Sequence, residues 1–239
     1  MAVRCAVLCI AALVLAGFAR FAMSADGPTD VVAGRCGKWA APARIDGKLV
    51  CLKDNQRCAM RLGVQYRRYG FVCNYGTLLT RWDALRRRSL SDLRISPGET
   101  CPVTTETGRV GPYDGLGPGP AYPIGTSSEV TLPMPPPEGW GPEWSGTKRL
   151  WLLDTRYAGR ALVRGRQLDG PNEVRFVLGR PAFTVQNRLH PVPQLQLDRA
   201  RDYPSLTRLR APGCYAYQVD GRTFSYLIIF EARVETTTP

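Results

Sequence analysis

The chain has 239 residues and a formal net charge of +12 at pH 7, from 32 Lys and Arg against 20 Asp and Glu. Its length is sufficient for one large domain or two modest ones. The sequence holds one histidine, His190, and no Cys-x-x-Cys pair, which argues against a metal centre and against histidine-dependent catalysis.

Residues 1–24 have the pattern of a secretory signal peptide. Arg4 supplies a positive charge, an apolar run covers residues 5–17, and Ala22-Met23-Ser24 places small residues before Ala25. We predict cleavage after Ser24; the alternative is that the segment is kept as an N-terminal anchor. No other stretch of the sequence is apolar enough to cross a bilayer. The expected location is therefore secreted, periplasmic or in the cell envelope, with no transmembrane segment in the mature chain.

Removal of this segment would leave six of the eight cysteines. An even number of cysteines in an exported chain favours disulfides, because the compartment is oxidising. Oxidised cysteines cannot act as nucleophiles or metal ligands, so we expect neither a metal nor another cofactor. The six are Cys36, Cys51, Cys58, Cys73, Cys101 and Cys214.

Residues 25–33 are predicted to be a flexible lead-in, and residues 34–80 a small cysteine-rich basic unit. In that unit Asp46-Gly47 indicates one hairpin turn, and Asn74-Tyr75-Gly76 indicates a second turn between strands. A helical turn or two is expected between these hairpins. A unit of this size buries too little apolar surface to be stable without staples.

Two stretches of the unit, residues 52–58 and 65–73, resemble a short two-cysteine segment of uncharacterised secreted bacterial proteins. In that segment Gln-x-Cys is followed by Tyr, Gly, an aromatic residue and Cys, as in Gln56-Arg57-Cys58 and Tyr69-Gly70-Phe71-Val72-Cys73. The resemblance implies that Cys58 pairs with Cys73, and it implies no activity. On its strength we set aside the other two pairings of the unit's four cysteines. We predict the disulfides Cys36–Cys51, Cys58–Cys73 and Cys101–Cys214.

Residues 81–100 form a basic linker in this interpretation, residues 101–234 a β-sandwich domain and residues 235–239 a tail. Residues 34–95 contain 14 Lys and Arg and 4 Asp and Glu, so their net charge of +10 is most of the excess of the chain. We place the domain boundary near Ser96-Pro97-Gly98, where this basic composition changes to a near-neutral one.

Short runs of β-branched and aromatic residues, separated by turn signals, favour a sandwich or barrel after residue 100. The last two runs flank Asp220-Gly221, a dipeptide that suits a type I′ hairpin turn. Residues 108–146 contain nine Gly and nine Pro, so regular elements are not expected there apart from a strand at 129–132. The other predicted strands are 150–153, 160–167, 173–178, 194–197 and 206–210.

The order of these strands resembles an immunoglobulin-like or fibronectin-like module in outline. Trp151 lies mid-domain, and Cys214-Tyr215-Ala216-Tyr217 stands at the place of that module's penultimate strand. The expected fold class is therefore mainly β, with a small disulfide-stapled N-terminal unit followed by an antiparallel β-sandwich that is immunoglobulin- or fibronectin-like in outline.

Two tryptophans, Trp140 and Trp144, lie in the Pro- and Gly-rich loop region. They could form an aromatic platform for a sugar or an aromatic partner, because loops on a rigid sandwich commonly carry function. The alternative is that they anchor the loop. Glu138, Glu143 and Asp154 lie near them in sequence and could serve a glycosidase, or could be solvated loop residues.

Arginines are concentrated in the small unit and the linker, interleaved with aromatic residues. Arginine binds phosphate and carboxylate in forks and stacks on aromatic rings. The predicted polyanion-binding residues are Arg61, Arg67, Arg68, Arg81, Arg86, Arg87 and Arg88, beside Tyr66, Tyr69, Tyr75 and Trp82. The alternative is that these arginines only face water.

The sequence thus favours a secreted, non-catalytic binding or interaction protein, not an enzyme, with an anionic cell-envelope polymer or another polyanion as the partner of its basic unit. It identifies no protein partner. Two other hypotheses remain: a structural envelope module without a ligand, and a hydrolase of wall polysaccharide. We also expect Arg86, Arg87 and Arg88 to be replaceable together without unfolding, since they lie outside the cysteine loops.

Overall fold

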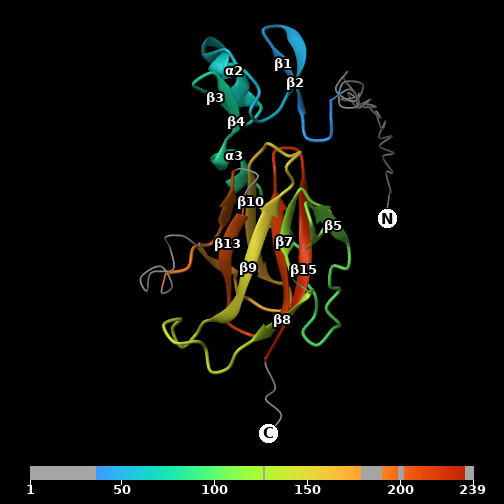
Figure 1. Ribbon diagram of the computed structural model, residues 1–239, viewed down its shortest axis with the longest axis vertical. Helices are drawn as coiled ribbons and strands as arrows, with labels where there is room; N and C mark the ends of the chain where they lie inside the picture. Colours follow the sequence, from blue (N-terminus) through green and yellow to red (C-terminus); the bar gives the residue numbers. More distant parts are fainter. Residues whose placement is uncertain (1–35, 126, 179–189, 199–201, 235–239) are drawn as a thin grey trace, which may run out of the picture.

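The computed structural model describes residues 36–125, 127–178, 190–198 and 202–234. The predicted signal peptide, lead-in and tail therefore lie outside the described residues. The described chain is mainly β, as expected, and has two parts. A small unit sits at one end of an elongated β-sandwich (Figure 1).

Two antiparallel hairpins and a short helical segment make up the small unit. Each hairpin turns through two residues with positive φ, as type I′ turns require. These residues are Asp46 (50°) with Gly47 (74°), and Tyr75 (45°) with Gly76 (78°). The elements are β1 (Ala41–Ile45), β2 (Lys48–Leu52), the 3-10 helix η1 (Met60–Leu62), α2 (Gly63–Arg68), β3 (Phe71–Asn74) and β4 (Thr77–Thr80).

The small unit has its own hydrophobic core, built mainly from alternate residues of its strands. Ala43, Leu52, Tyr66, Phe71 and Leu78 are buried there. Few side chains contribute, so covalent staples are needed to restrict the unfolded chain. The structure joins Cys36 to Cys51 and Cys58 to Cys73, the two pairs expected for this unit.

The sandwich packs a five-stranded sheet, in the order β12-β10-β14-β15-β8, against a six-stranded sheet, in the order β11-β13-β9-β7-β6-β5. All pairs are antiparallel except β15 with β8. Both sheets contribute to one core around Trp151, which lies edge-on to Tyr217 at 5.2 Å. The strands are β5 (Thr107–Val110), β6 (Tyr113–Leu116), β7 (Ala121–Ile124), β8 (Glu129–Leu132), β9 (Ser145–Leu153), β10 (Ala161–Gln167), β11 (Arg175–Leu178), β12 (Leu195–Leu197), β13 (Asp202–Leu209), β14 (Gly213–Asp220) and β15 (Ser225–Val234).

Strands β5, β6 and β7 lie where the glycine and proline content argued against regular structure, so that prediction is wrong. Two of the glycines sit inside strands because the side chain of Tyr122 packs directly against their Cα atoms. A Cβ atom on Gly108 or Gly115 would lie 2.4 or 2.3 Å from the side chain of Tyr122. The absence of side chains at these positions makes room for the buried tyrosine.

The final hairpin exists, but its turn is not the predicted two-residue turn. Asp220 is the last residue of β14 and pairs with Ser225, so the loop comprises Gly221–Phe224. The Asp220 side chain is fully buried and accepts a hydrogen bond from Ser225 Oγ at 2.7 Å. Its carboxylate thus belongs to the sheet and not to the turn.

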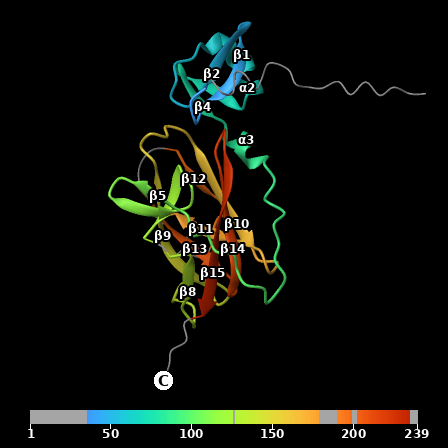
Figure 2. The same cartoon turned by 90° about the vertical axis from the view of Figure 1, so that its right-hand side faces the viewer.

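The segment predicted as a linker begins with α3 (Trp82–Arg86) and then runs along the sandwich (Figure 2). It lies on the outer face of the five-stranded sheet. Ser91 N donates to Gln218 Oε1 at 2.7 Å, and Ile95 N donates to Leu168 O at 3.1 Å. We call residues 87–104 the strap.

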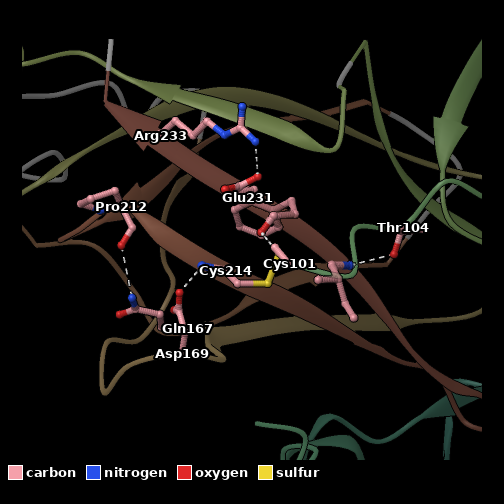
Figure 3. The surroundings of a disulfide bond; sticks show 10 residues. Cys101, Thr104, Gln167, Asp169, Pro212, Cys214, Glu231 and Arg233 are labelled. Carbon is pink, nitrogen blue, oxygen red and sulfur yellow. Dashed lines mark hydrogen bonds and ion pairs between the residues drawn. A yellow bond between two sulfur atoms is a disulfide. The ribbon is translucent and has the colours of Figure 1, made fainter. Parts of the chain in front are cut away.

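The strap is closed by the Cys101–Cys214 disulfide, the third expected pair (Figure 3). Cys214 lies on the outer side of β14, with its backbone N–H donating to Asp169 at 3.0 Å. Thr104 and Ile229 exchange two hydrogen bonds beside it. This disulfide therefore holds the strap to one sheet. In immunoglobulin domains the conserved disulfide links the two sheets, so the resemblance to that fold is limited to the general sandwich arrangement.

We expect Asp220→Asn to destabilise the fold, because Arg164 (2.7 Å) and Arg88 (3.8 Å) would lose a buried counter-charge. Breaking a buried pair in this way costs about 3 kcal/mol. Urea denaturation measures the change. The control is Asp83→Asn, an exposed carboxylate paired with Arg81, which should change little. Equal losses in the two variants would contradict this prediction.

The domain boundary is tested by limited proteolysis. Residues 96–100 are exposed, and Ser96 and Glu99 close a local turn with bonds of 3.1 and 2.7 Å. We expect the first cut there, which gives a C-terminal fragment that begins close to Thr100 and an N-terminal piece that stays bound to it through residues 88–95. A first cleavage inside residues 150–230 would contradict the boundary.

Candidate functional site

The predicted arginines divide into two groups according to their neighbours. Arg61, Arg67 and Arg68 are exposed, and the side chain of Arg61 is 75% exposed although Asp46 lies 3.9 Å away. Arg57, which the prediction did not include, is exposed beside them in sequence. These four arginines belong to the small unit and can meet a ligand without losing a buried contact.

The arginines of the predicted linker make closer contacts with carboxylates and backbone oxygens than those of the small unit. Arg81 and Arg87 both contact the Asp83 carboxylate, at 2.6 and 3.1 Å. Desolvation acts to raise the pKa of Asp83, but the hydrogen bond from Arg81 and the charges of both arginines lower it overall. Arg86 is exposed. Arg81 and Arg87 therefore offer a polyanion less positive charge than their number suggests.

The side chain of Arg88 is held in contacts that belong to the fold. Its guanidinium donates to the carbonyl oxygens of Phe224 and Arg222, and it lies 3.8 Å from Asp220. These contacts join the strap to the β14–β15 loop. The expectation that Arg86, Arg87 and Arg88 can be replaced together without harm to the fold is therefore wrong for Arg88, because its loss would weaken the attachment of the strap.

Most of the aromatic residues interleaved with the arginines already make contacts within the protein. Tyr66 is buried, and Tyr69 Oη accepts a hydrogen bond from Arg44 N at 3.0 Å. Trp82 lies under the guanidinium of Arg160 at 5.0 Å. Only Tyr75 among the four is exposed, at 92%.

Trp140 and Trp144 each stack against an arginine of the sandwich. Arg208 lies 3.3 Å from the ring centroid of Trp140, and Arg210 lies 4.5 Å from that of Trp144. Trp144 is only 7% exposed. These contacts favour the interpretation of the pair as loop anchors.

Of the carboxylates considered for hydrolysis, Glu138 is exposed in the loop, and Glu143 and Asp154 lie at opposite ends of one strand. Glu143 precedes β9 and pairs with Arg210 at 3.5 Å, whereas Asp154 follows β9 at its other end. A nine-residue strand spans roughly 30 Å. Asp154 binds Arg156 at 2.6 Å, and this hydrogen bond lowers the pKa of Asp154. The roughly 30 Å between the two ends of this strand is far beyond the separation of the two carboxylates of a glycosidase.

A cavity of about 540 Å³ lies at the junction of the small unit and the sandwich. Three segments line it: residues 37–40 and 51–55 of the small unit, and the β9–β10 loop at residues 156–159. Sequence reasoning did not find this site. The loop at residues 156–159 lies more than 100 residues after the two segments of the small unit, and no motif marks any of the three.

Other candidate chemistry is limited in the part of the chain that the structure describes. His190 is exposed. No group of three or more His, Cys, Asp and Glu side chains there could hold a metal ion. Within the same residues, no helix has both the length and the apolar character to cross a membrane.

Comparison with known proteins gives little. No family model and no curated protein matches the chain. Among solved structures, the crystal structure of a "Putative Lipoprotein from Bacillus anthracis" is similar at 9% identity, covering 62% of this chain and 99% of that one, with a TM-score of 0.35. A similarity this weak carries no argument.

We expect Trp144→Ala to lower the free energy of unfolding by about 3 kcal/mol, because it empties a buried aromatic site. Trp140→Ala should cost less, since this ring is partly exposed. Urea denaturation and binding to neutral polysaccharide are measured for both. Unchanged stability together with lost polysaccharide binding would establish a platform and contradict the anchor interpretation.

Proposed function

We propose that the protein is an exported, non-catalytic binding protein whose small unit binds an anionic polymer of the cell envelope. The observation that carries this proposal is a difference in charge pairing between the two parts. Among the described residues, Arg61 alone of the eight Lys and Arg side chains in residues 36–80 lies within ion-pair distance of a carboxylate. In the sandwich, the arginines with such partners include Arg109, Arg156, Arg164, Arg175, Arg210 and Arg233.

Exposed cations gather on one side of the short helical segment. Successive residues of an α-helix advance about 100°, so Val64, Arg67 and Arg68 of α2 fall within about a third of its circumference. Met60 and Arg61 lie in the preceding 3-10 helix, and both are exposed. Tyr66, on the opposite side, is buried in the small core. We call these five residues the exposed helix face.

Exposed apolar groups accompany the charges. Met60 is 66% and Val64 58% exposed on the exposed helix face, and Tyr75 is 92% exposed on the neighbouring hairpin. Cys58 N donates to Gly76 O at 2.8 Å, which brings that hairpin turn beside the start of the helical segment. A polymer that carries acid groups on sugar rings could use both kinds of contact: forks from arginine to the acid, and packing of a ring on Tyr75.

The disulfides support an exported location. Three disulfides in a chain of this size are typical of an oxidising compartment outside the cytoplasm. Anionic polymers are available to a protein there. Attraction to them would be long-range and would weaken as salt shortens the Debye length from ~10 Å at 0.1 M to ~3 Å at 1 M.

Polymer binding is tested with the full mature chain and immobilised polyglucuronate. Replacing Arg61, Arg67 and Arg68 by Ala should weaken binding at low salt by at least about tenfold, since each cation near an anionic surface is worth about 1 kcal/mol. The matched control replaces Arg94, Arg109 and Lys148 by Ala, three exposed cations outside the small unit. The control lowers the net charge equally and should retain binding.

Three results would contradict the proposal. Equal loss in the two triple variants would mean that only net charge matters. Equal binding at low and high salt would remove the electrostatic basis. Binding to anionic phosphatidylglycerol vesicles without binding to the polymer would assign the exposed helix face to a lipid surface.

A further inference from the structure

We propose that the junction cavity binds a small sugar that carries a carboxylate or a phosphate. This inference goes beyond the proposed function, because the cavity shares no lining residue with the exposed helix face. It rests on how firmly the walls are built, on which charges surround the opening and on the size of the space.

Packing and hydrogen bonds between the two parts of the protein fix the cavity walls. Trp39 lies edge-on to Tyr157 at 5.4 Å, and Tyr157 is buried with its Oη donating to Arg160 O at 2.8 Å. Asn55 Nδ2 crosses the junction and donates to Ala158 O at 2.8 Å. A ligand would therefore enter a site that is already formed, which reduces the entropy cost of binding.

A covalent link fixes the remaining wall. Cys36–Cys51 ties the segment that carries Lys38 and Trp39 to β2, just before Lys53. The backbone of this segment also turns on itself, with Ala40 N donating to Gly37 O at 2.9 Å. The aromatic wall and the two lysines thus belong to one braced structure.

Positive charges predominate around the cavity. Lys38 and Lys53 are exposed lining residues, and among the described residues neither lies within ion-pair distance of a carboxylate. Arg156 adds a third cation, although it is paired with Asp154 at 2.6 Å. The lining carboxylate, Asp54, is buried and accepts hydrogen bonds from the backbone N–H and the hydroxyl of Thr80. An anionic group of the ligand would therefore meet the two lysines first.

The space suits a sugar ring. A volume of about 540 Å³ lies in the range of about 300–1,000 Å³ that small-molecule sites occupy. Gly37, Ala40, Ala158 and Gly159 leave room between the walls, and the Trp39 ring is a lining surface on which the apolar face of a sugar could pack. A ring with hydroxyl groups and one acid group matches this combination of aromatic, amide and ammonium groups.

The site is tested by NMR titration of the 15N-labelled mature chain with glucuronic acid and with glucose 6-phosphate. We expect shifts concentrated on the amides of Lys38, Lys53, Asn55 and Ala158. Glucose, the neutral control, should bind at least fivefold more weakly. A tetraglucuronate arm distinguishes two sources of the ligand: tighter binding of the oligomer assigns the end unit of a polymer, and equal or weaker binding assigns a free sugar acid.

Variants locate the charge requirement. Lys38→Gln with Lys53→Gln should weaken binding of the acidic sugars at least fivefold, whereas Lys48→Gln, an exposed lysine of the same unit outside the cavity, should not. The Ala variant of Arg61, Arg67 and Arg68 should bind the sugars normally, which separates this site from polymer binding. Shifts that map elsewhere, glucose binding as tight as that of glucuronic acid, undiminished binding in the double variant, or no binding of either acid would overturn the proposal.

Discussion

The buried carboxylate of Asp220 is the interaction on which the arrangement of the protein depends. It lies at the end of β14, bound by Arg164 of β10 at 2.7 Å and approached by Arg88 of the strap at 3.8 Å. A buried charge is costly unless it is paired and hydrogen-bonded, and here the pairing comes from two separate segments. Gln218 extends the same network, because its amide contacts both Asp220 and the backbone of Ser89. These contacts hold the first residues of the strap against the end of β14.

Further contacts near the same end of the sheet hold the small unit on the sandwich. The next loop, Gly221–Phe224, carries Arg222, which donates to Tyr69 O in the small unit. Arg160, just before β10, donates to Thr80 O at 2.8 Å. These bonds bring the small unit's basic residues to the end of a near-neutral sandwich, and the junction cavity lies between the two parts. The junction cavity is thus a consequence of how the small unit contacts the sandwich.

Local signals in the sequence were sufficient for much of the fold. Asp46-Gly47 and Tyr75-Gly76 form the predicted turns because their backbone preferences are local. Strands β5 to β7 were missed because Gly108 and Gly115 are explained only by Tyr122, a residue further along the chain. Likewise, nothing local distinguishes Arg88 from Arg87, although one reaches a buried carboxylate and the other an exposed one. The cavity could not be predicted for the same reason: its walls meet only in the folded chain.

The Asp220 network and the junction contacts hold the two parts as one body. Backbone 15N relaxation of the protein without residues 1–24 measures this most directly, because each part reports its own rotational correlation time. We expect a single correlation time, appropriate to the whole molecule, for residues 36–80 and for the sandwich. A distinctly shorter correlation time for residues 36–80 would mean that the small unit tumbles on a flexible linker and that these contacts do not hold it.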